Sequence, residues 1–221
     1  AQEGSALTIT QGLALGMKSC MLPCIILGAG IIIAYYVSGM YGVAMAAAGM
    51  LSWMLIDVIK TGRPTVIGAC TGGVIGLVAI TPGAGFVPVW SSVIIGLTVS
   101  PICYFAVAVL KKKFGYDDAL DAFGCHGIGG IWGGITTGIF ADSSINPVAR
   151  WDGLIFGDFH LFAVQIAGIL VTIAVSVAGT LICAGIVRLF TKLRAEEHDE
   201  KIGLDAAEHG ESAYPSFNGL D

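Results

Sequence analysis

The chain has 221 residues, of which 55% are hydrophobic and only 12% are charged, with a formal net charge of −5. Soluble domains carry roughly a quarter charged residues, so this composition and its long apolar runs indicate an integral membrane protein in a lipid bilayer. A nucleic-acid partner is not expected, because the sequence has no basic stripe with interleaved aromatic residues.

Six apolar segments have nearly the length of a membrane-spanning helix, which needs about 17–25 residues. In chain order, we expect spans at about 13–37, 40–59, 65–81, 90–110, 119–141 and 161–190. The third span is short, and the sequence Thr81-Pro82-Gly83 predicts a break at its end. The expected fold class is therefore all-α, a polytopic membrane helix bundle of about six transmembrane helices.

Basic residues between the spans predict how the chain is oriented. Three clusters fall on one side if every span crosses the membrane: Lys60 with Arg63, Lys111 to Lys113, and Arg188 with Lys192 and Arg194. The loops on the other side carry only Arg150. By the positive-inside rule, the basic side and both chain termini are predicted to be cytoplasmic.

The 32 glycines of the chain collect within the expected spans, where small residues let helices approach one another closely. In the third span, Gly68, Gly72 and Gly76 recur every four residues and form one smooth strip. A second strip on the fifth span is predicted for helix packing: Gly130, Gly134 and Gly138. Both helices are therefore expected to pack against protein rather than lipid.

The six cysteines lie in apolar stretches and indicate small buried hydrophobic residues rather than a disulfide framework. No cysteine pair has metal-ligand spacing, so neither a metal site nor a cofactor is expected.

His126 lies about 10 Å inside the fifth expected span, at 1.5 Å of rise per residue, and an ionisable group at such depth is a functional hypothesis by default. Cys125 and His126 are adjacent and point about 100° apart on a helix, which disfavours a shared metal ion and a nucleophilic Cys–His pair. Two hypotheses stay open: a neutral imidazole that lines a path for a small polar molecule, and a structural histidine bonded to another helix.

Three aspartates precede His126 at the start of the same helix. Asp117 and Asp118 are suited to N-terminal capping and to the favourable end of the helix dipole. Asp121 lies one turn deeper and needs a specific partner, such as backbone amides or a neighbouring helix.

The last segment, 195–221, is polar, and its composition is typical of a solvated end. Three residues give it something to dock with: Leu204, Tyr214 and Phe217.

From about Leu51 onward, the chain resembles the C-terminal half of the ammonium transporter family (Amt/Mep/Rh). Three stretches carry the resemblance: LSWMLIDVIKTGRPTVIGACTGGVIGLVAITPGAGFV, DDALDAFGCHGIGGIWGGITTGIFA and the tail GLDAAEHGESAY. The resemblance implies half of an inverted-repeat ammonium channel fold that transports ammonium or ammonia and is not an enzyme.

The resemblance also implies roles for particular residues. His126 matches the second of two histidines that face each other in a narrow pore, and Asp118 and Asp121 match acidic positions that support it. Subunits are expected to form a homotrimer with one pore each. The tail resembles a cytoplasmic regulatory segment that a PII-type partner can act on, through Gly203, Leu204, Asp205, His209, Gly210, Glu211 and Tyr214.

The chain also departs from this family. A full member has about eleven spans and a first pore histidine in an earlier helix, whereas this chain has room for six, so conduction by one chain alone is not expected. Residues 1–50 resemble a segment of the ion-pumping membrane pyrophosphatases without their Asp-rich motifs. The expected organisation is a pyrophosphatase-like membrane segment at 1–50, an ammonium-transporter-like membrane domain at 51–194 and a cytoplasmic tail at 195–221. Two alternatives stay open for the function: a fragment of a membrane pyrophosphatase-type ion pump, or a non-transporting membrane module with a regulatory tail.

Overall fold

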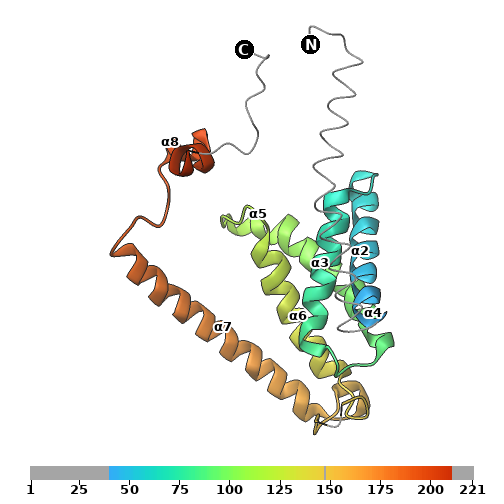
Figure 1. Cartoon of the computed structure of the whole chain (residues 1–221). Coiled ribbons are helices and arrows are strands. Elements are labelled where there is room, and N and C mark those ends of the chain that lie inside the picture. The colour runs from blue at the N-terminus through green and yellow to red at the C-terminus, as the bar shows by residue number, and fades with distance from the viewer. Residues whose placement is uncertain (1–39, 147, 211–221) are drawn as a thin grey trace. The chain divides into compact units, whose positions relative to one another are not determined.

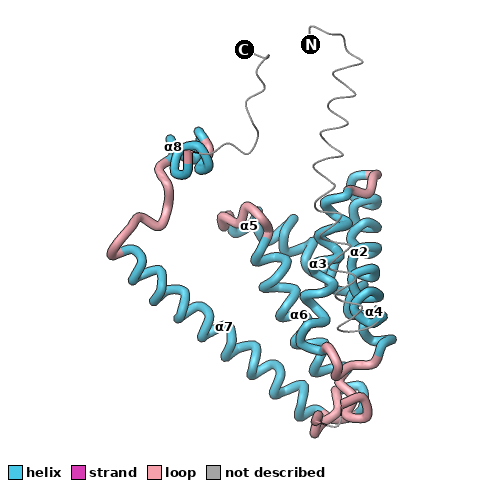
Figure 2. Tube along the Cα trace, viewed as in Figure 1, coloured by secondary structure: helices cyan, strands magenta, loops and turns pink. Residues whose placement is uncertain are grey.

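The computed structural model describes residues 40–146 and 148–210, so the expected first span at 13–37 lies outside the described residues. All regular elements in the described part are helical, which confirms the all-α class (Figure 2). The chain divides into two compact units, residues 1–169 and residues 170–221, and each unit is described by itself.

The first unit is built around helix α3 (Val66–Ile80), which contacts α2 (Met40–Thr61), α4 (Val89–Phe105) and α6 (Ile128–Phe140) (Figure 1). Thr65 caps the start of α3 by accepting a hydrogen bond from the Gly68 N–H. The helix ends at Ile80 and passes into a 3₁₀ turn at Thr81–Gly83, where the Thr-Pro-Gly sequence predicts a break. The core of this unit holds the buried side chains of Met45, Ile75, Ile95, Val99 and Cys103.

Glycines set the distance between α2 and α3. A Cβ atom on Gly49 would lie 2.3 Å from the carbonyl oxygen of Gly72, and one on Gly76 would lie 2.6 Å from the carbonyl oxygen of Met45. Neither helix could therefore keep this backbone contact with a larger residue at these positions. Two of the three expected glycines of the third span, Gly72 and Gly76, thus pack against backbone of α2.

Helix α4 continues through a π-helical segment at Ala106–Leu110 (η2) into α5 (Lys111–Phe114). Pro101 lies inside α4 and has no N–H to donate to the carbonyl of Leu97, four residues earlier. The Ser52 hydroxyl of α2 donates to that Leu97 carbonyl oxygen over 2.8 Å. One turn along, the Ser100 hydroxyl donates to the Gly49 carbonyl oxygen over 2.7 Å. These two bonds join α2 and α4 within the apolar bundle.

Replacing Ser52 with alanine is expected to lower the free energy of unfolding by about 1–2 kcal/mol, because the Leu97 carbonyl loses its donor in an apolar setting. Ser92→Ala is a matched control, since the buried Ser92 hydroxyl donates to Val89 in its own helix. Denaturant unfolding of the detergent-solubilised chain measures both variants. Equal losses for the two would contradict a specific role for the Ser52 bond.

The fifth expected span begins later than the sequence suggests. Residues 119–121 precede the helix, which starts at Ala122, runs through a π-helical turn at Phe123–Gly127 (η3) and continues as α6 to Phe140. The expectation that Ala119 and Leu120 belong to the span is therefore wrong. Apolar side chains at both positions suggested a longer helix, but Asp118 caps the chain and Asp121 turns it just before Ala122.

Four described stretches are long and apolar enough to cross a membrane: Ala44–Thr61, Val66–Gly83, Val89–Phe114 and Phe159–Arg188. The last is α7, a 30-residue helix in which no residue is buried. A 3₁₀ turn at Leu154–Phe156 precedes α7. Residues 170–188 of α7 belong to the second unit, which also holds α8 (Glu197–Ile202) and a π-helical turn at Asp205–His209.

Candidate functional site

His126 lies in the π-helical turn at Phe123–Gly127, a kind of irregularity that occurs frequently at functional sites. Its side chain is exposed in the described chain, whereas its neighbour Cys125 is buried. No described residue forms a hydrogen bond with the imidazole. The two side chains therefore point in different directions, and nothing in the described part of the chain holds His126 as a structural group.

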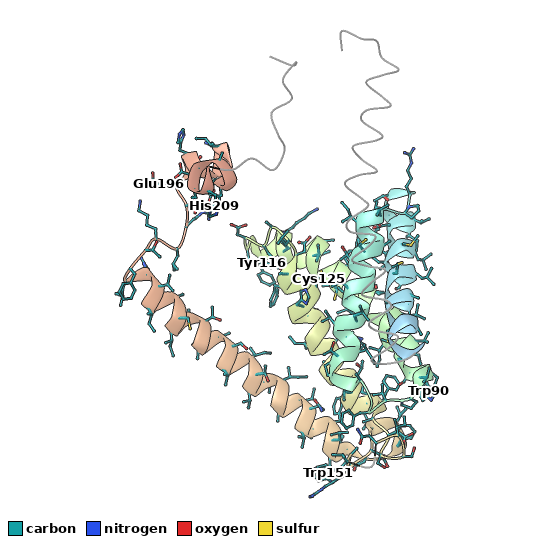
Figure 3. The ribbon with its side chains drawn as sticks, in the orientation of Figure 1. Trp90, Tyr116, Cys125, Trp151, Glu196 and His209 are labelled. Atoms are coloured by element: carbon teal, nitrogen blue, oxygen red, sulfur yellow. The ribbon has the colours of Figure 1, made fainter. Side chains whose placement is uncertain are left out.

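His126 opens into a cavity of about 650 Å³. Cys125, beside it, lies toward the end of the bundle that carries Tyr116, away from Trp90 and Trp151 (Figure 3). The cavity is lined from α2, α3, α4 and the start of the His126 helix, by residues that include Trp53, Asp57, Thr65, Tyr104 and Asp121. Polar side chains from three different helices thus lie around the same cavity as the imidazole.

Asp118 caps the helix that carries His126. One carboxylate oxygen of Asp118 accepts a hydrogen bond from the Ala122 N–H, and the other accepts one from the Phe123 N–H, both over 2.9 Å. A carboxylate at this end also interacts favourably with the helix dipole. Asp118 therefore sets the residue at which this helix begins and the orientation of its first turn.

Lys111 connects α5 to the same helix start. Its ammonium group donates to Asp121 Oδ1 over 2.7 Å and to the Asp118 carbonyl oxygen over 2.6 Å. Asp121 has φ of +55°, a left-handed conformation that is uncommon for a residue other than glycine. Its own carbonyl accepts a hydrogen bond from the Cys125 N–H over 2.9 Å. Lys111 thus holds a strained residue that leads directly into the turn bearing His126.

Replacing Lys111 with methionine is expected to loosen this helix start and to expose Cys125 to alkylation. Partly exposed ion pairs are worth on the order of 1 kcal/mol, so labelling of Cys125 is expected to rise roughly fivefold. Lys111→Arg keeps the charge and should restore most of the protection. Lys112→Met is the control, because Lys112 is exposed and forms no interaction with a described residue. Mass spectrometry of maleimide-treated chain reads the result, and equal labelling in both methionine variants would refute it.

Asp57 is a site residue that the sequence-based reasoning missed. Only 7% of Asp57 is exposed, although it lies within an apolar span. Its Oδ2 atom accepts hydrogen bonds from the Thr65 hydroxyl over 2.7 Å and from the Thr65 N–H over 3.3 Å. The stretch LSWMLIDVIK contains the feature that could have identified it, because a lone carboxylate inside an apolar run indicates a functional residue.

Two aromatic residues stand beside Asp57. Trp53 lies one helical turn before it, and Tyr104 of α4 packs edge-on against Trp53, with ring centroids 5.3 Å apart. Both rings line the cavity that His126 lines. The site therefore combines a carboxylate, an imidazole and two aromatic rings.

The glycine strip expected on the fifth span is divided in the structure. A Cβ atom on Gly134 would lie 2.9 Å from Ile169 and one on Gly138 would lie 3.0 Å from Phe162, so both glycines face α7. Gly130 has no described atom within 4 Å of such a Cβ, so the close packing expected for it is not found. The contact with α3 falls instead to Gly133, whose Cβ would lie 2.3 Å from the Ala79 carbonyl oxygen.

The tail residues named from the sequence are described only in part. Gly203 and Gly210 have φ of +102° and +64°, conformations that favour glycine, and Leu204 and His209 are exposed. Asp205 belongs to a π-helical turn, whereas Glu211 and Tyr214 lie outside the described residues. Exposed ion pairs surround α8: Lys192–Glu196, Arg194–Glu200 and Lys201–Glu197.

Among residues 40–146 and 148–210, no group of three or more His, Cys, Asp or Glu side chains could hold a metal ion.

Comparison with known proteins identifies the family. The sequence profile of the Ammonium Transporter Family matches residues 23–214. The chain belongs to this family. It is 52% identical over 169 residues to the ammonium transporter of Bacillus subtilis (strain 168), covering 76% of this chain and 42% of that relative. This family member is thus an integral membrane protein.

Solved structures agree with the family assignment. The crystal structure of Saccharomyces cerevisiae Mep2 superposes with a TM-score of 0.71 at 38% identity, covering 85% of this chain and 43% of the yeast chain. A structure described as a sensor Amt protein superposes with a TM-score of 0.66 at 26% identity, covering 77% of this chain and 41% of that one. The chain spans about two fifths of the length of the curated relatives that it matches.

The match to the Ammonium Transporter Family also bears on the N-terminal segment. It begins at residue 23 and so reaches into residues 1–50, where the sequence resembles a membrane pyrophosphatase. The comparisons do not show a pyrophosphatase chimera.

Proposed function

We propose that this chain carries one wall of an ammonium or ammonia path across the membrane, with His126 as the pore group. The observation that carries the proposal is the exposure of His126 on a cavity of about 650 Å³, without a hydrogen bond to any described residue. A neutral imidazole can donate with one nitrogen and accept with the other, so it guides a small polar molecule without adding charge.

Asp118 and Asp121 support His126 in this proposal. Asp118 caps its helix, and Asp121 is paired with Lys111 at the cavity wall. In inverted-repeat transporters the substrate site lies between two halves, so a second wall completes the path. A separate half-fold or a second copy of this chain supplies that wall.

The orientation and the partners are part of the same proposal. The α2–α3 turn with Lys60 and Arg63 lies toward the same end of the first unit as α5 with its lysines (Figure 1). By the positive-inside rule, this end and both termini face the cytoplasm. A homotrimer and a PII-type regulator acting on the tail follow from the family resemblance, and a size measurement in detergent tests the trimer.

Complementation in vesicles tests the transport function. The chain is reconstituted together with the portion of the Bacillus subtilis ammonium transporter that lies outside the matched residues, and methylammonium uptake is measured. We expect uptake only when both parts are present, and none when the chain carries His126→Ala. No uptake with both parts inserted would refute the proposal for this chain. Pyrophosphate hydrolysis above that of empty vesicles would favour the pyrophosphatase alternative instead.

A further inference from the structure

Asp57 presents one unpaired carboxylate oxygen inside the bundle. Two hydrogen bonds, from the N–H and the hydroxyl of Thr65, both go to Oδ2. Oδ1 has no hydrogen-bond partner among the described residues. Asp57 is nevertheless 93% buried, since only 7% of it is exposed.

The free oxygen faces the cavity. Every fully buried side-chain nitrogen or oxygen in the described part has a hydrogen-bond partner, so the unpartnered Oδ1 must keep access to open space. The open space beside Asp57 is the cavity that this residue lines together with His126. Gly68 preserves this arrangement, because a Cβ atom there would lie 2.2 Å from Asp57 Oδ2.

None of the ion pairs in the described part of the chain includes Asp57. A carboxylate inside a membrane span is costly unless a cation accompanies it. The described lining of the cavity contains neither lysine nor arginine, and the other lining carboxylate, Asp121, is already paired with Lys111. Asp57 therefore leaves an unmatched negative charge in a partly enclosed, apolar space.

The neighbours of Asp57 select the kind of cation. Trp53 and Tyr104 line the same cavity, and aromatic faces attract organic and ammonium-type cations. Calcium and magnesium ions instead need several oxygen ligands, and the described residues offer no metal-binding group of three or more His, Cys, Asp or Glu side chains. An ammonium-type cation can both donate a hydrogen bond to a carboxylate oxygen and interact with an aromatic face.

We infer that Asp57, Trp53 and Tyr104 form a binding site for a small ammonium-type cation in the cavity that His126 lines. The inference rests on the proposed transport function, and it adds a cation-binding step at the basic end of the path.

Fluorescence titration tests this site without requiring transport. Methylammonium chloride is added to the detergent-solubilised chain at constant ionic strength, with sodium chloride in the reference titration. We expect a saturable change in tryptophan fluorescence with methylammonium only, and loss of that change in Trp53→Phe. Asp57→Asn keeps an acceptor for Thr65 but removes the charge, and it should weaken the apparent affinity about tenfold or more.

Asp158→Asn is the matched control, because Asp158 accepts a hydrogen bond from the His160 N–H and does not line the cavity. This variant should bind like the unmodified chain. Equal affinity of Asp57→Asn and Asp158→Asn would overturn the inference. If Asp57→Asn does not fold, Tyr104→Leu takes its place, and its affinity for methylammonium is expected to fall about threefold or more. Unchanged affinity in Tyr104→Leu would overturn the inference as well.

Failure of this site and failure of the proposed function give different results. In one case, Asp57→Asn leaves uptake in the complementation assay unaltered, and methylammonium causes no saturable fluorescence change. This result overturns the cation site and leaves the transport function standing. Saturable binding that depends on Asp57, without uptake, supports the site and refutes transport.

Discussion

Replacing His126 with aspartate is expected to abolish methylammonium uptake in the complementation assay, with a loss of about 100-fold or more. The reason is electrostatic. Burying a fixed carboxylate on the cavity wall costs a few kcal/mol, and the carboxylate would retain a cation that has to move along the path. It would also be a third carboxylate in the lining, beside Asp57 and Asp121. Initial rates of labelled methylammonium uptake measure the effect.

His160→Asp is the matched control for this prediction. His160 packs against Trp151, with ring centroids 4.6 Å apart and the rings tilted by 50°, and it does not line the cavity. Its replacement should leave uptake within about twofold, because a change in an exposed contact affects stability little. Similar losses for the two histidines would argue against a pore role for His126.

Replacing Gly133 with alanine is expected to lower the free energy of unfolding by about 2–3 kcal/mol. The added methyl group would lie 2.3 Å from the Ala79 carbonyl oxygen, and a backbone atom of α3 can move away only if the two helices separate. Denaturant unfolding in detergent, followed by circular dichroism, measures this loss.

Gly130→Ala makes the same chemical change one turn away on α6. The space around Gly130 is open among the described residues, and alanine is favoured over glycine in a helix by about 1 kcal/mol. This variant should therefore be neutral or slightly stabilised. A loss equal to that of Gly133→Ala would show that α6 does not pack on α3 in the way described.

Much of the fold follows from the sequence because apolar length alone sets where membrane helices lie. The expected spans at 40–59, 65–81 and 90–110 correspond to α2, α3 and the continuous run from α4 to α5. The start of the His126 helix could not be placed in this way. Asp118 and Asp121 stop the helix through hydrogen bonds and a left-handed turn, which apolar length does not reveal.

The faces of the helices were harder to predict than their bounds. In a soluble helix a polar stripe marks the exposed face, but α3 and α6 are apolar on all sides. A glycine repeat then predicts a close contact without saying which of two adjacent strips makes it. Gly130 and Gly133 differ by three residues and face different surroundings.

The candidate site was predicted in part. His126 stood out because it is an ionisable residue in the middle of an apolar run. Asp57 is as unusual in its own run, but it lies near Lys60 and so suggests a helix end at the membrane surface. Only the three-dimensional arrangement places Asp57, Trp53 and Tyr104 on the cavity that His126 lines.

The bonds between α2 and α4 have a consequence for sequence variation. Ser52 and Ser100 both donate to backbone carbonyl oxygens, which every amino acid provides. The side chain of residue 97 can therefore change between apolar types without weakening the bond that Ser52 makes. Leu97 is exposed in the described chain, so its side chain can vary while the two serine bonds keep the register of α2 and α4.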